Sequence, residues 1–224
     1  MRCTRWGGST GGIGNQNFVF LTKIKDMVDV ARKEKLYTIG EYFELEERSE
    51  VKHEFHNGKL IPMAGGTFNH NTISVNFGAA LFNCFSKGGK DYSAASSDQK
   101  VYVPAINKGV YPDVTVCSGE PEFYPGKKTV ITNPLLIVEV LSEETEHYDR
   151  TDKFDNYCSI PSFREYVLVA QDKPFVEVFY LHDPETGLWK ISRASGLDAS
   201  ITLRSVDCVL SLRDIFRMIK NLAA

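Results

Sequence analysis

The segment 135–141 constrains the fold more than any other part of the chain. It is apolar throughout except for Glu139. An unbroken apolar run of this length is typical of a strand that is buried on both faces of a sheet. Such a strand needs covering elements on both sides. The segment therefore predicts a sheet flanked by helices, in the α/β or mixed α+β class.

The surrounding pattern supplies those elements. Thr38 followed by Glu41 predicts a capping box and a helix over 39–47. Asn57-Gly58 predicts a hairpin between 51–55 and 59–63. Asn69 or Asn71 is expected to cap a helix over 72–86. Further strands are expected at 92–95, 99–103, 110–117, 165–170, 176–182 and 189–192, and further helices at 149–158 and 212–222.

We expect one domain, over residues 36–222 of the 224. The segment 1–35 holds Gly-Gly twice and lacks the apolar core of a signal peptide. It is therefore interpreted as a disordered or mis-assigned N-terminal extension, with Met27 as a plausible true start.

Composition excludes several classes of protein. A hydrophobic share of 42% excludes disorder as the main state, and a net charge of −3 argues against a histone-like nucleic-acid binder. No apolar stretch is long enough to span a membrane, and no GxGxxG or Walker pattern supports a nucleotide cofactor. The five cysteines are scattered. They predict neither a disulfide framework nor a zinc site, and they favour a reducing cytoplasm.

Two acidic residues stand where apolar residues are expected. Asp113 interrupts the predicted strand 110–117, and Glu139 interrupts 135–141. An ionised carboxylate in an apolar strand costs several kcal/mol unless it is paired or binds a cation. A divalent metal ion between two such strands would remove both penalties. The alternative is that each carboxylate reaches solvent at a strand end or pairs with arginine or lysine.

Four further residues are candidates for the same site. Lys153 could activate water or stabilise charge near a scissile phosphate, and Tyr157, one helical turn later, could orient it. Glu54 could supply another carboxylate, although a cross-strand pair with Lys59 is an equal alternative. His70 could contact phosphate or water, although a structural role at the start of its helix is the more common case.

These residues lie in blocks whose order resembles the Uma2 family of restriction-endonuclease-like proteins, within the PD-(D/E)XK nuclease superfamily. The blocks are Glu54 with Asn57-Gly58, Met63-Ala64-Gly65-Gly66 before His70, Tyr111-Pro112-Asp113, Ile137 to Ser142, Tyr148-Asp149-Arg150 with Lys153, Tyr157, and Glu165 to Val169. The resemblance runs from Tyr37 to Ile215.

The resemblance implies a restriction-endonuclease-like core, a mixed β-sheet flanked by helices with an N-terminal helix-hairpin. It implies that Asp113 and Glu139 bind Mg²⁺, with Mn²⁺ as a substitute, that Glu54 is an additional active-site and metal-binding acid, and that Lys153 is catalytic. The superfamily's lysine normally lies two residues after the strand acid. Leu141 occupies that position here, which implies that the lysine has moved to the following helix.

The leading hypothesis is thus a Mg²⁺-dependent endonuclease that hydrolyses DNA, with a homodimer expected by analogy with the superfamily. The alternative is a catalytically inactive nuclease-fold protein that acts as a nucleic-acid-binding or assembly module, since a fold does not guarantee an activity. Glycoside hydrolysis also uses paired carboxylates. It is disfavoured because Trp6 and Trp189 are the only tryptophans available for a sugar platform.

Overall fold

The computed structural model describes residues 35–142 and 145–223. The predicted extension at 1–35, with Met27 as a start, lies outside these residues except for Lys35. The unit Tyr37–Ala224 is described below by itself. Among the described residues, no helix has both the length and the apolar character needed to cross a bilayer.

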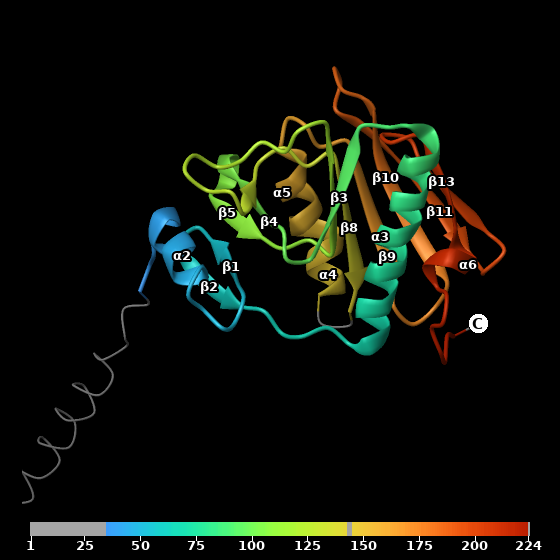
Figure 1. Cartoon of the computed structure of the whole chain (residues 1–224), viewed down its shortest axis with the longest axis horizontal. Coiled ribbons are helices and arrows are strands. Elements are labelled where there is room, and N and C mark those ends of the chain that lie inside the picture. The colour runs from blue at the N-terminus through green and yellow to red at the C-terminus, as the bar shows by residue number, and fades with distance from the viewer. Residues whose placement is uncertain (1–34, 143–144, 224) are drawn as a thin grey trace, which may run out of the picture. The chain divides into compact units, whose positions relative to one another are not determined.

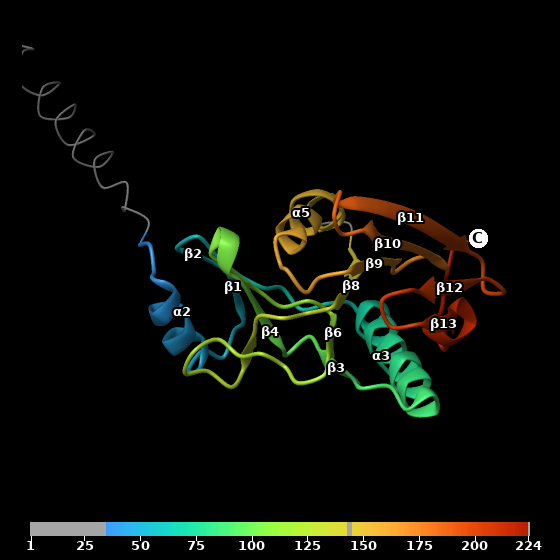
Figure 2. The ribbon, with the colours of Figure 1, turned by 90° about the horizontal axis from the view of Figure 1, so that it is seen from above.

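The larger sheet holds six strands in the order β11-β10-β9-β8-β6-β3, which can be followed in Figure 1 and Figure 2 together. Its strands are β3 (Tyr92–Ser96), β6 (Val114–Ser118), β8 (Leu136–Leu141), β9 (Glu165–Ala170), β10 (Phe175–Asp183) and β11 (Leu188–Ser195). Only β8 and β9 run parallel, and the other neighbours are antiparallel. The sheet is therefore mixed, as the sequence predicts.

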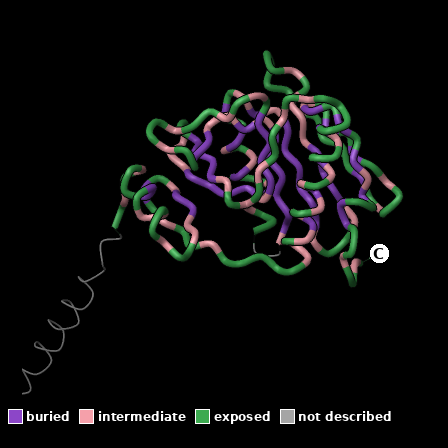
Figure 3. The backbone as a smooth tube through the Cα atoms, in the orientation of Figure 1, coloured by how far each residue is buried: buried purple, intermediate pink, exposed green. Residues whose placement is uncertain are grey.

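Helices cover both faces of this sheet. The long helix α3 (Phe68–Gly88) lies on one side of β8 and β9, and α5 (Phe154–Cys158) lies on the other (Figure 2). Every residue of β8 is buried, and buried positions concentrate along the strands between the two helices (Figure 3). The sequence prediction for 135–141 is confirmed, because the alternate side chains of β8 enter two different cores.

A smaller sheet has the order β2-β1-β5-β4-β7. Its elements are β1 (His53–His56), β2 (Lys59–Pro62), β4 (Lys100–Val103), the 3₁₀ turn Pro104–Ile106, β5 (Lys108–Val110) and β7 (Val130–Ile131). Helix α2 (Ile39–Glu46) packs Tyr42 and Phe43 against Phe55 of this sheet. The capping box of Thr38 and Glu41 is present, and the Asn57-Gly58 hairpin forms as predicted.

The predicted strand 110–117 is wrong as a single strand. It divides into β5, which belongs to the smaller sheet, and β6, which belongs to the larger one. Pro112 lies at the break, where its missing N–H removes a donor from the ladder. Asp113 therefore lies just before β6 and does not interrupt a strand.

Three helices also differ from prediction. The cap of α3 is Thr67, not Asn69 or Asn71, so the helix begins earlier than 72. The helix expected at 149–158 begins with α4 (Glu146–Tyr148) and contains a π-helical segment, Asp149–Lys153, before α5. The last helix, α6 (Leu212–Ile215), stops far short of 222 because the chain turns through positive φ at Met218 and Asn221.

The hairpin β12 (Ser200–Leu203) and β13 (Cys208–Ser211) was not predicted, although Ile201 and Leu203 alternate as buried residues.

One disulfide joins Cys84 of α3 to Cys208 of β13, across 124 residues of sequence. The expectation that the cysteines form no disulfide is thus wrong for this pair. The two residues meet because α3 packs beside β13, which their spacing in the sequence does not reveal. Among the described residues, Cys117 and Cys158 are free.

Removing this disulfide is expected to lower the stability of the fold. A crosslink that closes a loop of about 100 residues restricts the unfolded chain by roughly 4 to 5 kcal/mol in the chain-entropy model, and measured losses run from about 2 to 5 kcal/mol. Urea denaturation of Cys208→Ala should show this loss relative to the oxidised parent, whereas Cys158→Ala should leave the free energy of unfolding nearly unchanged. Equal stability of Cys208→Ala and the oxidised parent would contradict the prediction.

Candidate functional site

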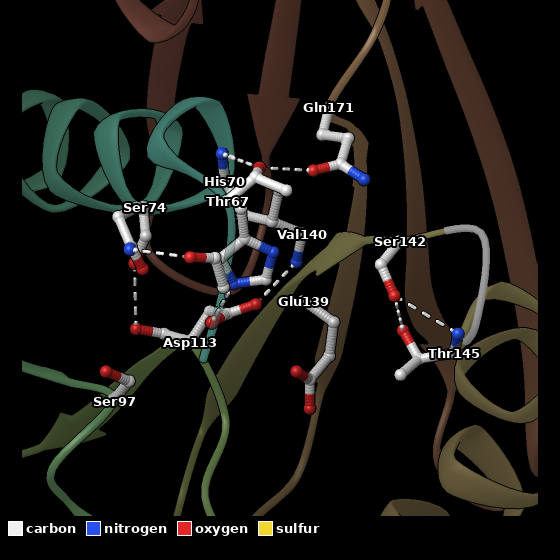
Figure 4. A network of polar contacts seen from close by, with 12 residues as sticks. Thr67, His70, Ser74, Ser97, Asp113, Glu139, Val140, Ser142, Thr145 and Gln171 are labelled. Atoms are coloured by element: carbon white, nitrogen blue, oxygen red, sulfur yellow. Dashed lines mark hydrogen bonds and ion pairs between the residues drawn. The ribbon is translucent and has the colours of Figure 1, made fainter. Parts of the chain in front are cut away.

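Asp113 lies just before β6, opposite Glu139 of β8. The register pairs Val114 with Val138, so its continuation places Asp113 opposite Glu139. The Asp113 Oδ2 atom accepts a hydrogen bond from the Val140 N–H at 2.7 Å, and Oδ1 lies 2.8 Å from His70 Nε2 (Figure 4). Ser74 donates to the Asp113 carbonyl at 3.1 Å. Strand β8 and helix α3 therefore hold the Asp113 carboxyl group from two sides.

Glu139 is 3% exposed and has two partners in the core. Its Oε1 accepts a hydrogen bond from the Tyr157 hydroxyl at 2.9 Å and lies 2.9 Å from Lys153 Nζ. Burial raises the pKa of Glu139 to about 8; Asp149 and Asp113 add to this rise, while Lys153 opposes it. Tyr157 thus orients the Glu139 carboxyl group, whereas the sequence predicted that it orients Lys153.

Lys153 is the cationic centre of the site. Its buried Nζ lies 2.9 Å from Glu139, 3.2 Å from Asp149 and 3.9 Å from Glu54. Burial alone would lower the pKa of Lys153, but the surrounding acidic groups, Glu139 foremost, raise it well above its ordinary value. The ammonium group therefore stays charged and attracts carboxyl groups from three separate elements.

Glu54 reaches this centre from β1 of the smaller sheet. Its Oε2 contacts His56 Nε2 at 2.9 Å, and the strand register places Ile61 opposite it, while Lys59 lies opposite His56. Burial acts to raise the pKa of Glu54, but the Lys153 charge and the His56 contact outweigh it and leave this pKa below its ordinary value. The Glu54 carboxylate is accordingly ionised near neutral pH.

Asp149 is a member of the cluster that the sequence interpretation missed. From the sequence it is named only as part of a family block and is assigned no role, yet it is buried and ion-paired with Lys153. The spacing of four residues between Asp149 and Lys153 was the available signal, since such residues are neighbours on a helix.

The π-helical segment that carries Asp149 and Lys153 is anchored to the larger sheet. Arg150, at the second position of this segment, is ion-paired with Glu177 of β10. Arg193 of β11 binds the other Glu177 oxygen at 2.7 Å, and Glu146 lies 2.8 Å from Arg150. These contacts fix the segment at its outer face while Lys153 points to the inner one. Single-turn π segments often occur at functional sites.

The residues present fit a hard divalent cation. Asp113 and Glu139 offer carboxylate oxygens, and no described residue donates a hydrogen bond to Glu139 Oε2. Mg²⁺ keeps several of its waters and is commonly held by one or two carboxylates. Within the described ranges, no group of three or more His, Cys, Asp or Glu residues is arranged to hold a metal. A complete cage of protein ligands is therefore not formed there.

Comparison with known proteins places this geometry in a family. The model of the Uma2 family, described as "Putative restriction endonuclease", matches residues 39–213. The chain belongs to the Uma2 family. The match includes Glu54, His70, Asp113, Glu139 and Lys153. The resemblance expected from the sequence is confirmed.

The chain is also similar to two curated proteins and to a solved structure. The uncharacterized protein slr1290 of Synechocystis sp. is 35% identical over 79% of this chain and 90% of its own length. The uncharacterized protein sll1609 of the same organism is 36% identical over 61% of this chain and 76% of its own. A crystal structure of a "putative nuclease belonging to DUF820" from Anabaena variabilis superposes with a TM-score of 0.63 at 16% identity, covering 80% of this chain and 97% of that one. The chain thus shares the mixed α+β fold of that protein.

Proposed function

We propose that this Uma2-family chain is a Mg²⁺-dependent endonuclease that hydrolyses DNA phosphodiester bonds. The juxtaposition of Asp113 and Glu139 on neighbouring strands, with Lys153 at 2.9 Å from Glu139, supports this proposal. Asp113 and Glu139 would hold Mg²⁺, or Mn²⁺ in its place, with Glu54 as an additional acid. DNA is the proposed substrate because the family is described as restriction endonucleases.

The chain's own residues would each contribute to hydrolysis. Bound Mg²⁺ would supply a Lewis acid for the phosphoryl oxygen and lower the pKa of a coordinated water. Lys153 would stabilise negative charge that develops on the phosphate and position the attacking water. Tyr157 fixes the Glu139 carboxyl group, and His70 fixes the Asp113 carboxyl group. Glu54 holds Lys153 from the side of the smaller sheet.

The cellular location is also a proposal. The sequence favours the cytoplasm, but the Cys84–Cys208 disulfide weighs against a strongly reducing compartment. Counting free thiols in protein that is trapped by alkylation directly from cells separates the two cases.

A second candidate function has its own support. Lys153 is ion-paired with Glu139 and Asp149, and His70 contacts Asp113, so each of these three carboxyl groups already has a polar partner from the chain itself. A nuclease-fold protein that binds nucleic acid or assembles with partners, without catalysis, would have such a network.

Metal binding distinguishes the two candidates. Millimolar Mg²⁺ or Mn²⁺ is expected to raise the Tm of the protein at pH 8.5, because a ligand of the native state stabilises it. The rise should be smaller at pH 6.5, since the pKa of Glu139 is about 8 in the metal-free protein and the cation must then displace a proton. The same preparation should nick supercoiled plasmid, and EDTA should stop the nicking. Absence of both the Tm rise and the nicking would favour the non-catalytic candidate.

A further inference from the structure

Helix α3 carries a stripe of exposed apolar side chains in addition to its buried face. Phe68, Val75 and Phe82 are 83%, 70% and 69% exposed. Their spacing of seven residues places them in one line along the helix. The core-facing residues Ile73 and Phe77 are fully buried, so the stripe is not part of the fold's own packing. Exposed apolar side chains gathered in this way mark an interaction site more often than single ones do.

A groove lies beside this stripe, between α3 and strand β3. It has a volume of about 680 Å³, and its walls include Val75 and Phe82 of the stripe, Gly78 of the same helix, and Ala94 of β3. Figure 1 shows α3 and β3 next to one another along this side of the molecule. We call the stripe, the groove and the outer edge of β3 together the α3–β3 face.

Strand β3 is a free edge of the larger sheet and lacks the usual protection of such edges. No described strand pairs with its outer side. Its sequence, Tyr-Ser-Ala-Ala-Ser, holds neither a charged residue nor proline. The opposite edge, β11, carries Lys190 and Arg193. Charged side chains, proline and bulges are the devices that keep an edge strand from pairing, so β11 is protected while β3 is left able to pair.

Charge decides which partner fits this face. Helix α3 contains no acidic residue, and its one lysine or arginine, Lys87, lies in the last turn. Lys90, in the groove wall, is held by Asp207 and the Val206 carbonyl. A nucleic acid backbone would find almost no free cation here. A second copy of the same neutral face meets no like-charge repulsion, and a two-fold axis sets an edge strand antiparallel to itself.

The available area agrees with a partner of this kind. The exposed parts of Phe68, Val75 and Phe82 amount to roughly 400 Å² of apolar surface. A standard interface buries about 800 Å² on each partner. The groove walls and the edge of β3 lie beside the stripe and supply further surface. We propose that the α3–β3 face is the interface of a two-fold homodimer. This inference is independent of the proposed nuclease activity.

The test compares two valines of equal exposure. Val75 of the stripe is 70% exposed and Val209 of β13 is 68% exposed, so glutamate at either position should be tolerated by the fold. Sedimentation equilibrium of the full chain is expected to give a dimer for the parent and for Val209→Glu, and a monomer for Val75→Glu. Circular dichroism should show the same melting profile for the two variants at concentrations where all species are monomeric.

Two outcomes would overturn the proposal. One is a parent protein that stays monomeric at high micromolar concentration, as it would if another segment of the chain or a different protein covers the face. The other is a Val75→Glu protein that remains dimeric. Phe82→Ser provides a second, neutral substitution in the stripe and should weaken the dimer at least tenfold, so a failure of Val75→Glu to fold still leaves a decisive measurement.

Discussion

Replacing Asp113 by asparagine is expected to abolish Mg²⁺-dependent nicking of plasmid DNA while the fold remains intact. Asparagine keeps the size of the side chain and an oxygen that can accept the Val140 N–H, so the position of the residue is preserved. It removes the negative charge that a divalent cation requires from its ligands. The rate of conversion of supercoiled to open-circular plasmid measures the effect, and Glu139→Gln should behave in the same way.

The matched control is Asp172→Asn, which makes the same chemical change at an exposed position. It should nick DNA at the rate of the parent protein. If Asp113→Asn or Glu139→Gln retained that rate, the roles proposed for the two carboxylates would be wrong, and the nicking would have to come from a contaminant or another site.

Replacing Lys153 by methionine is expected to lower the free energy of unfolding by about 3 to 5 kcal/mol, the range for breaking a buried ion pair from one side. Methionine fills a similar volume but leaves Glu139 and Asp149 buried without their cation. Chemical denaturation at pH 9, above the pKa of about 8 that Glu139 has in the folded protein, measures the loss. Lys128→Met, at an exposed position, should change stability by less than about 0.5 kcal/mol.

A double variant shows whether Lys153→Met loses stability because Glu139 is left without a cation or because the side chains pack less well. Adding Glu139→Gln to Lys153→Met removes one of the stranded charges, and it should recover part of the lost stability. The energetic coupling between the two sites should therefore be large, as expected for residues in direct contact. Strictly additive losses would mean that Lys153 does not balance the Glu139 charge, which would contradict the arrangement in the core.

The sequence was most informative where a charged residue stands in an apolar segment, because burying that charge without a partner costs free energy. Glu139 in an apolar strand was found in this way, whereas Lys153 was identified through the family resemblance, and both belong to the cluster. Asp113 was found for a partly wrong reason: Pro112 ends the strand before it, so its carboxyl group sits at the joint between two sheets. The pattern of apolar residues does not show when a strand changes sheets.

Other features depend on packing between segments that are distant in sequence. Cys84 and Cys208 are joined because α3 lies against β13, and no local pattern records this. The π-helical segment at 149–153 reads as ordinary helix in its sequence, because the extra residue in a turn is stabilised by Glu177 on a strand far along the chain. The cap of α3 was misplaced because three residues near its start, Thr67, Asn69 and Asn71, are all suitable caps, and the side-chain geometry selects Thr67.

The cluster of Lys153 with Glu54, Glu139 and Asp149 forms only while the smaller sheet stays packed against the rest of the domain. Glu54 comes from the smaller sheet, whereas Glu139 comes from the larger one, and a single ammonium group lies between them. If the hairpin β1–β2 separated from the rest of the domain, that group would lose one of its three counter-ions and the cluster would open to water. Fraying of this N-terminal hairpin would therefore expose the buried cluster to water, even though every residue of the larger sheet stays in place.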